Sequence, residues 1–209
     1  CIMVKWSLAA ELLATMMIVV LMVYYREKKL VVTGKGKVYR SCLGLSLATF
    51  LLNVVCVYTI EHTEQVPRAV NLILNSAYFL ATVLTCSVIV LYLCYLILEH
   101  VYDKRHLRWA SLCISGATLG YLLLVLWNLS SGVLFSFDPA GNYRRGPLNR
   151  IGYALMAAEL LLLAVCYVQN RASVNRPMVK LMHMLPPLAI FLTAFQLAYP
   201  QILLNGMMM

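Results

Sequence analysis

Charged residues, and acidic ones above all, are scarce in this chain. Of its 209 residues only 8 are Asp or Glu, while charged residues make up 12% and hydrophobic residues 62%. Soluble domains typically contain about 25% charged residues. The composition therefore argues against a soluble globular fold, which needs more charge to keep its surface hydrated.

Signatures of catalysis and of metal binding are also missing from the sequence. The seven cysteines form no Cys-x-x-Cys pair, and six of them lie in apolar stretches, where a packing role is the favoured interpretation. No H-E-x-x-H motif, nucleophile elbow or phosphate-binding glycine loop occurs. We therefore predict no catalytic residue, no metal site and no cofactor, and the sequence leaves enzymatic activity open.

What the sequence has instead is long apolar stretches. A helix of ~20 apolar residues crosses the ~30 Å bilayer core, and these stretches lack the alternation of barrel strands. The prediction is an all-α, polytopic transmembrane helix bundle that forms a single domain over residues 1–209, and Ile202–Met209 is expected to begin a seventh span. The six complete spans are predicted at Trp6–Tyr25, Ser41–Ile60, Ala69–Leu98, Trp109–Leu129, Ile151–Val168 and Leu181–Tyr199.

The loops between these stretches alternate in basic charge. Twelve Lys and Arg residues lie on one side of the membrane and five on the other. Cytoplasmic loops have an excess of Lys and Arg, so we predict a multi-pass protein of the plasma membrane with its N-terminus outside. The same rule explains the net charge of +9, and no nucleic-acid partner is predicted. The twelve are Arg26, Lys28, Lys29, Lys35, Lys37, Arg40, Lys104, Arg105, Arg108, Arg171, Arg176 and Lys180; the five are Lys5, Arg68, Arg144, Arg145 and Arg150.

One external loop, Gly132–Pro147, has a pattern of its own. Residues Leu134–Asp138 alternate about Phe135 and Phe137, and Pro139–Asn142 supplies turn-forming residues. Alternation followed by a turn predicts a short β-hairpin on the extracellular side. Two interpretations stay open: a cap over the outer mouth of the bundle that has a role in binding, and an ordinary connector that shields helix ends.

Two acidic residues fall inside the apolar stretches. Ionisable side chains in a membrane are costly, and they usually face the bundle interior and mark a functional site. Glu11 shares one helical face with Ser7 and Thr15, and Glu159 lies near the middle of the fifth span. Both are predicted to bind a ligand, and Glu159 is expected to face the interior. The alternative for each is a structural acid bonded to a neighbour.

The third stretch has a polar stripe. Asn71, Asn75, Tyr78, Thr82 and Thr85 follow helical spacing and share one face. Asparagines that faced lipid would leave their amide groups unpaired, so this face should look inward. The stripe either lines a cavity or forms hydrogen bonds between helices, each worth ~0.6 kcal/mol on average. We favour the cavity because five polar residues share the face.

The other polar residues gather in the outer halves of their spans, where a pocket open to the outside is predicted. Asn53 of the second span and Gln196 of the sixth fall at this depth. A basic rim that includes Arg68 and Arg144 would suit a small polar or zwitterionic ligand, whose identity stays open. The predicted ligand-binding residues are Glu11, Asn53, Asn71, Asn75, Tyr78, Glu159 and Gln196.

Three segments resemble the N-terminal seven-helix sensor module of bacterial membrane signalling proteins, such as diguanylate cyclases and histidine kinases. They are AAELL (Ala9–Leu13), TIEHTEQVP (Thr59–Pro67) and LFSFDPAGNYRRGP (Leu134–Pro147). The resemblance implies an external N-terminus and a cytoplasmic output domain, a GGDEF cyclase or a kinase, after the seventh helix. No output motif occurs in this sequence, which ends early by comparison. By analogy with such sensors we expect a homodimer.

These observations favour a transmembrane sensory receptor module. An external small-molecule ligand would bind the outer pocket, the helices would pass the change to the cytoplasm, and membrane lipids would surround the bundle. The alternative is a small-solute transporter or transporter subunit, which would need a polar path to the inner side, where the spans are more apolar. A membrane-embedded enzyme is the third hypothesis, and the lack of a paired His, Asp or Glu cluster argues against it.

Overall fold

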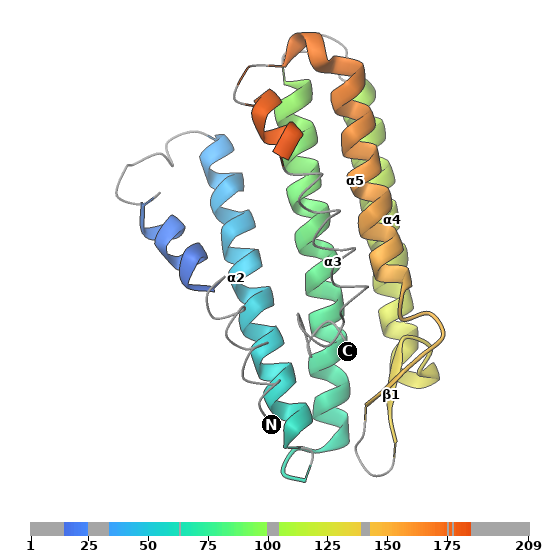
Figure 1. Ribbon diagram of the computed structural model, residues 1–209. Helices are drawn as coiled ribbons and strands as arrows, with labels where there is room; N and C mark the ends of the chain where they lie inside the picture. Colours follow the sequence, from blue (N-terminus) through green and yellow to red (C-terminus); the bar gives the residue numbers. More distant parts are fainter. Residues whose placement is uncertain are drawn as a thin grey trace.

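The computed structural model describes residues 15–24, 34–62, 64–99, 105–138, 143–174, 176 and 178–184. This part of the chain is predominantly helical and contains one two-stranded sheet (Figure 1). Shorter helical segments are Thr15–Tyr24, 178–184 and the 3-10 helix η2 (Arg171–Ser173). The long helices are α2 (Gly34–Glu61), α3 (Arg68–Leu98), α4 (Arg105–Ser131) and α5 (Ile151–Asn170).

The four long helices run alternately up and down, and α3 is central (Figure 1). It packs against α2, α4 and α5, whereas α4 and α5 touch each other much less. The short loop between α2 and α3 ends at Pro67, whose ring has no N–H to leave unsatisfied at the start of a helix. The carbonyl of Pro67 accepts hydrogen bonds from the N–H groups of Val70 (2.9 Å) and Asn71 (3.3 Å).

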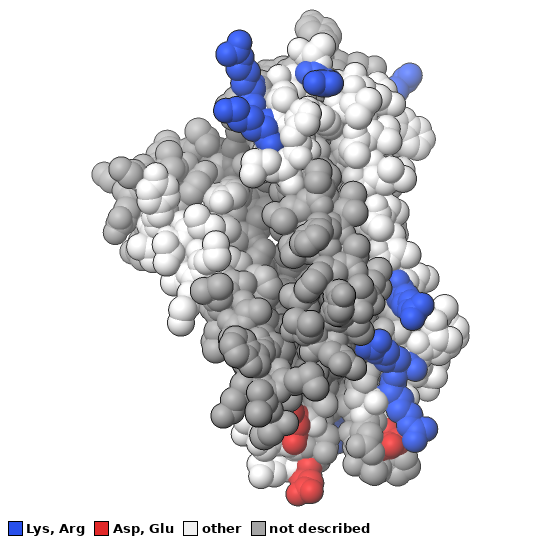
Figure 2. Space-filling model, viewed as in Figure 1, with Lys and Arg blue, Asp and Glu red and all other residues white. Residues whose placement is uncertain are grey.

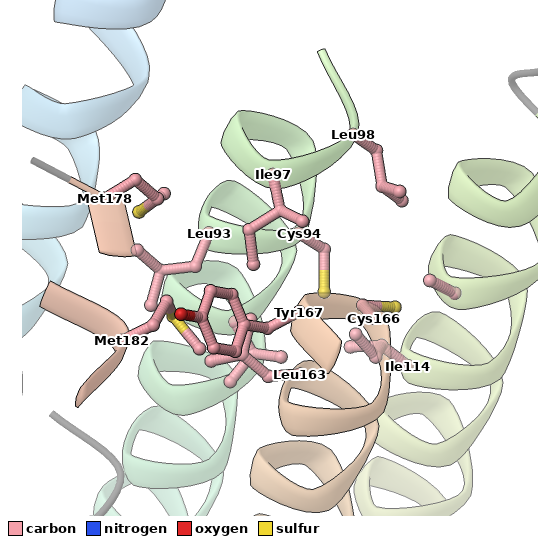
Figure 3. Close-up of a cluster of buried hydrophobic side chains, with 12 residues drawn as sticks. Leu93, Cys94, Ile97, Leu98, Ile114, Leu163, Cys166, Tyr167, Met178 and Met182 are labelled. Atoms are coloured by element: carbon pink, nitrogen blue, oxygen red, sulfur yellow. The ribbon is translucent and has the colours of Figure 1, made fainter. Parts of the chain in front are cut away.

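A large apolar core, the inner cluster, fills the bundle near the end where α3 and α5 finish. Figure 3 shows Cys94 of α3 and Cys166 of α5 with their sulfur atoms side by side in this core. The cysteines of the described residues are free, as expected of packing residues. The inner cluster consists of Val90, Leu93, Cys94, Ile97, Leu98, Ala110, Ile114, Leu163, Cys166, Tyr167, Met178 and Met182.

A β-hairpin lies at the opposite end of the bundle, here called the hairpin end (Figure 1). Strand β1 (Phe135–Phe137) pairs antiparallel with β2 (Tyr143–Arg145). Phe135 and Phe137 are buried, and the ring of Phe135 stacks on that of Phe79 of α3 at a centroid distance of 5.2 Å. Aromatic contacts of this kind add to the stabilisation that burial provides. The hairpin is therefore packed onto α3 as well as joined to α4 and α5.

Asn128 in the last turn of α4 anchors the start of this hairpin. Its Oδ1 atom accepts hydrogen bonds from the backbone N–H groups of Leu134 (2.6 Å) and Phe135 (3.1 Å). Gly132 ends α4 with φ of +66°, a conformation that favours glycine at a helix C-terminus. A Cβ atom on Gly146 would lie 2.1 Å from the backbone oxygen of Val133. Glycine is therefore required at this close approach of the two hairpin arms.

The return arm of the hairpin is held by Asn149. The side-chain amide of Asn149 donates to the carbonyl of Leu134 (3.0 Å) and to the hydroxyl of Tyr143 (3.3 Å). Burial raises the pKa of Tyr143, because an ionised phenol would lose its hydration there. The phenol thus stays neutral and packs against Phe135 and Phe137.

The helical fold and the hairpin agree with the sequence prediction, with adjusted boundaries. Within the described residues, four helices are long and apolar enough to cross a membrane: α2 counted from Gly36, α3, α4 and α5. They correspond to the second to fifth predicted spans. Only Thr15–Tyr24 and 178–184 represent the first and sixth spans, and the predicted start of a seventh lies outside the described residues. Leu134 departs from the predicted alternation, because it is buried beside Phe135.

Replacing Asn128 by leucine should loosen the hairpin. Asn128→Leu removes the acceptor of two buried backbone N–H groups, and an unpaired buried donor costs about 1–3 kcal/mol. Thermal unfolding of the detergent-solubilised protein should therefore show a clearly lower Tm. Ser131→Ala is the control, because the Ser131 hydroxyl is exposed and bonds only to the carbonyl of Trp127 among the described residues. Equal Tm values for the two variants would contradict the anchoring role.

Candidate functional site

Three asparagines are buried between α2 and α3 in the half of the bundle that includes the hairpin end. Asn53, Asn71 and Asn75 are each at most 2% exposed. Tyr78, which follows Asn75 on α3, is also buried. We call these four residues the asparagine cluster. Buried amide groups are costly unless they form hydrogen bonds, so their partners decide whether the cluster is a helix contact or a binding site.

Two polar contacts set how α2 and α3 align. Nearer the hairpin end, the amide of Asn71 on α3 donates to the carbonyl of Thr59 on α2 (3.3 Å). Farther from that end, the hydroxyls of Thr49 on α2 and Thr85 on α3 are 2.9 Å apart. Because the helices are antiparallel, this alignment places Asn53 about level with Tyr78. The predicted inward orientation of the polar stripe is therefore confirmed for its buried members, Asn71, Asn75 and Tyr78.

The amide oxygens of two asparagines have no donor among the described residues. The Nδ2 of Asn75 donates to the carbonyl of Asn71 (2.8 Å), and Nδ2 of Asn71 donates to Thr59. These bonds fix the orientation of each side-chain amide, because exchanging its nitrogen and oxygen would place the amide oxygen against a carbonyl oxygen. The Oδ1 atoms of Asn71 and Asn75 are buried and lack a hydrogen-bond partner within the described part of the chain. Within the described residues, two buried acceptors thus lack a donor.

Glu159 lies elsewhere, between α3, α4 and α5. It is 3% exposed, which confirms that it faces the interior. The hydroxyl of Ser87 on α3 lies 2.6 Å from its Oε1 atom, and the hydroxyl of Thr118 on α4 lies 2.8 Å from that of Ser87. These three residues form the Glu159 network, which joins three helices. The other carboxyl oxygen, Oε2, has no partner among the described residues.

The predicted site residues therefore fall into two groups. Asn53, Asn71, Asn75 and Tyr78 lie together between α2 and α3, whereas Glu159 lies against Ser87, which is twelve residues or ~18 Å from Asn75 along α3. The structure therefore does not support a single pocket that contains both the asparagines and Glu159.

Two further predicted site residues and one predicted contact cannot be placed. Glu11 and Gln196 lie outside the described residues, as does the hairpin turn at 139–142. Convergence of the asparagines beneath that turn stays a prediction, as does the ligand-binding role of every site residue.

The sequence did not single out Ser87 and Thr118, and it did not assign a role to Asn128. Serine and threonine in an apolar helix bond readily to the carbonyl four residues earlier, as Thr82 does to Tyr78. Their presence therefore does not indicate a partner on another helix. The described residues contain no group of three or more His, Cys, Asp or Glu side chains able to hold a metal ion.

Comparison with known proteins adds no further constraint on the site. No protein-family model, no curated protein and no solved structure matches this chain. Function must therefore be argued from the geometry of the two polar groups and from the chemistry of the surfaces around them.

Removing the hydroxyl that joins Glu159 to α4 should destabilise the bundle. Ser87→Ala leaves Glu159 Oε1 and the Thr118 hydroxyl without their shared partner, at a cost of about 1–3 kcal/mol for buried polar groups. Thr82→Val is the control, because the Thr82 hydroxyl bonds within α3 to the Tyr78 carbonyl. Denaturant or thermal unfolding should show a larger loss for Ser87→Ala. A larger loss for Thr82→Val would refute a stabilising network.

Proposed function

We propose that the chain is a multi-pass membrane protein whose long helices cross the bilayer. Large apolar side chains are exposed on each of them, among them Val55, Ile73 and Leu161. Such surfaces are aggregation-prone in water and suited to lipid. The tryptophans Trp109 and Trp127 are exposed on one face of α4, eighteen residues or ~27 Å apart. This spacing fits the two aromatic belts at the boundaries of a bilayer core.

The distribution of charge supports an orientation with the hairpin end outside. On the face drawn in Figure 2, Lys and Arg lie at both ends of the molecule, and acidic residues are visible only at the hairpin end. Excess positive charge marks the cytoplasmic side. The opposite end includes the basic residues Lys37, Arg40, Arg105, Arg108, Arg171, Arg176 and Lys180 together with Glu99, while the hairpin end includes Arg68, Arg144, Arg145 and Arg150 together with Glu61, Glu64 and Asp138.

Within this membrane protein, the asparagine cluster is the proposed ligand site of a sensory receptor module. The observation behind this proposal is the pair of buried Oδ1 atoms, on Asn71 and Asn75, that lack a donor among the described residues. Both are acceptors, so the ligand should present N–H or O–H groups. A small polar molecule or a zwitterion with an ammonium group, arriving from the hairpin end, has this chemistry.

A transporter is the second candidate, and the packing of the inner half argues against it. A transported solute would need a polar route from the asparagine cluster past the inner cluster. The residues of α3 that follow Ser87 on its buried faces, Val90, Leu93 and Ile97, belong to that apolar core. A receptor needs no such route, since binding has only to favour one helix arrangement over another.

In the proposed receptor, α3 transmits the signal. Ligand binding between α2 and α3 would shift α3 relative to α4 and α5, which it contacts further along. The resemblance of three segments to seven-helix sensor modules supports a cytoplasmic output domain, such as a diguanylate cyclase or a kinase, and a homodimer. The output domain and the homodimer are both part of the proposal.

The orientation can be tested by cysteine labelling in whole cells. We expect a membrane-impermeant maleimide to label Arg144→Cys in intact cells, because Arg144 is 72% exposed at the hairpin end. Lys37→Cys, exposed at the other end, should react only after permeabilisation. The unaltered chain serves as the blank for its native cysteines. The reverse pattern would place the asparagine cluster in the cytoplasmic half and rule out an external ligand there.

Ligand binding can be tested by the thermal shift of the purified protein with matched small zwitterions. Amino acids such as glycine have an ammonium donor, whereas their N-trimethylated counterparts, such as glycine betaine, have none. We expect stabilisation by members of the first group only, because the available atoms are acceptors. A screen of amino acids and amines in which no compound, or only the trimethylated ones, raises the Tm would contradict the donor-accepting site.

The same assay with variants locates the site. Asn75→Leu should abolish the ligand-induced shift, since losing one hydrogen bond in a built polar site costs about 1–3 kcal/mol, or roughly 5- to 150-fold in affinity. Asn170→Leu is the matched control, because Asn170 also donates to a carbonyl four residues earlier, that of Cys166, far from the cluster. Loss of the shift in both variants would show that the effect is structural.

A further inference from the structure

Two exposed arginines and two exposed apolar side chains lie together where the hairpin returns to α5. Arg145 is the last residue of β2, and Arg150 directly precedes α5. Both are exposed, and of the apolar residues between and beside them Leu148 is 37% and Ile151 is 41% exposed. Side chains of both kinds suit a membrane boundary, where apolar atoms reach the hydrocarbon and a guanidinium reaches the headgroups. We call these four residues the arginine patch.

Arg150 lies at the depth where the outer boundary of the bilayer core is expected. The Glu159 network places Glu159 of α5 and Thr118 of α4 at a similar depth, and the two helices run in opposite directions (Figure 1). Nine residues toward the hairpin end, about 13.5 Å along each helix, lie Arg150 and Trp127. Thr118 is midway between Trp109 and Trp127, and a core of ~30 Å extends ~15 Å to either side of its midplane. Arg150 is therefore level with the proposed outer aromatic belt, next to the headgroups.

The backbone that carries the first arginine of the patch is held in place. Arg145 pairs with Phe135 in the register of the hairpin. The N–H of Gly146 donates to the carbonyl of Leu134 (2.8 Å), and the side-chain amide of Asn149 donates to the same carbonyl (3.0 Å). A group on a preorganised backbone loses less conformational entropy when it binds a partner. The hairpin therefore presents its arginine in a fixed position.

The segment that carries the patch has an excess of positive charge. From Asp138 to Ala158 the chain contains three arginines and one acidic residue. That acid, Asp138, contacts Arg144 at 3.4 Å, and Arg144 points to the other face of β2 from Arg145 because successive residues of a strand alternate. Figure 2 shows basic side chains gathered on the hairpin side of this end. The charge of the patch is therefore complementary to an anion.

We propose that the arginine patch binds the phosphate group of an anionic phospholipid in the outer leaflet. Guanidinium groups bind phosphate oxygens through two parallel hydrogen bonds, while Leu148 and Ile151 contact the start of the acyl chains. In a zwitterionic lipid the headgroup's own ammonium competes with the arginines for the phosphate. The positive-inside rule does not account for these arginines, because it concerns the cytoplasmic side. This inference rests on the proposed membrane location and orientation, and it is independent of a ligand at the asparagine cluster.

The test is photo-crosslinking from the centre of the patch. Leu148→benzoylphenylalanine is introduced into the full chain, which is reconstituted in liposomes of equal parts phosphatidylglycerol and phosphatidylcholine with identical acyl chains. Mass spectrometry then identifies the attached lipid. We expect phosphatidylglycerol adducts to exceed phosphatidylcholine adducts about fivefold or more, the effect of one arginine near an anionic surface. Adducts in equal amounts would overturn the lipid site and leave the membrane location standing, whereas the absence of any lipid adduct would overturn both.

Matched variants separate a defined site from a general attraction of charge. Arg145→Gln/Arg150→Gln should bring the two adducts to equal amounts. Arg68→Gln/Arg144→Gln removes two exposed arginines of the same end and should keep the preference, so that an equal loss in both double variants would overturn the site. Excess inorganic phosphate should leave the preference unchanged relative to sodium chloride of the same ionic strength. A preference abolished by phosphate alone would show that the patch binds the free anion and would overturn the assignment to lipid.

Discussion

The structure depends on α3, which contacts α2, α4 and α5. One side has the buried amide that bonds to α2. Another side has Phe79 and Val83 in the cluster with the hairpin and α4, and further along Ser87 against Glu159 of α5. In the proposed membrane location, lipid offers no hydrogen bonds, so a helix with buried polar groups on two sides is stable only where other helices surround it. The central position of α3 follows from this constraint.

The polar side chains of α3 differ along the helix in whether they have hydrogen-bond partners. Toward the hairpin end, two asparagine oxygens lack a donor in the described part of the chain, whereas the Thr82 and Thr85 hydroxyls further along bond to carbonyls of their own helix. Beyond Ser87 the buried side chains become apolar. In the described part of α3, buried polar groups without a partner thus lie toward the hairpin end and apolar side chains toward the other end, which is the arrangement that the proposed receptor for an external ligand would need.

The proposed ligand site acts on α3 through its contact with α2. A ligand at Asn71 and Asn75 would change the α2–α3 contact by supplying missing donors. Further along, the hydroxyl of Ser87 joins α3 to Glu159 of α5 and to Thr118 of α4. Since α3 contacts all three other long helices, a shift of α3 at the proposed ligand site would change the packing of the whole bundle.

The sequence by itself determined the helical architecture, the hairpin and the inward direction of the buried asparagines, because long apolar runs, turn residues and helical spacing are local properties. The cost of an ionisable side chain in a membrane also predicted that Glu159 faces inward, which its burial confirms. Only the tertiary structure decided that Glu159 is bonded to Ser87 apart from the asparagines, and that Asn128 anchors the hairpin. Spacing defines a face of a helix but not the neighbour opposite it. A hydroxyl or amide in a membrane helix can bond to its own backbone, so its partner is settled only by how the helices pack.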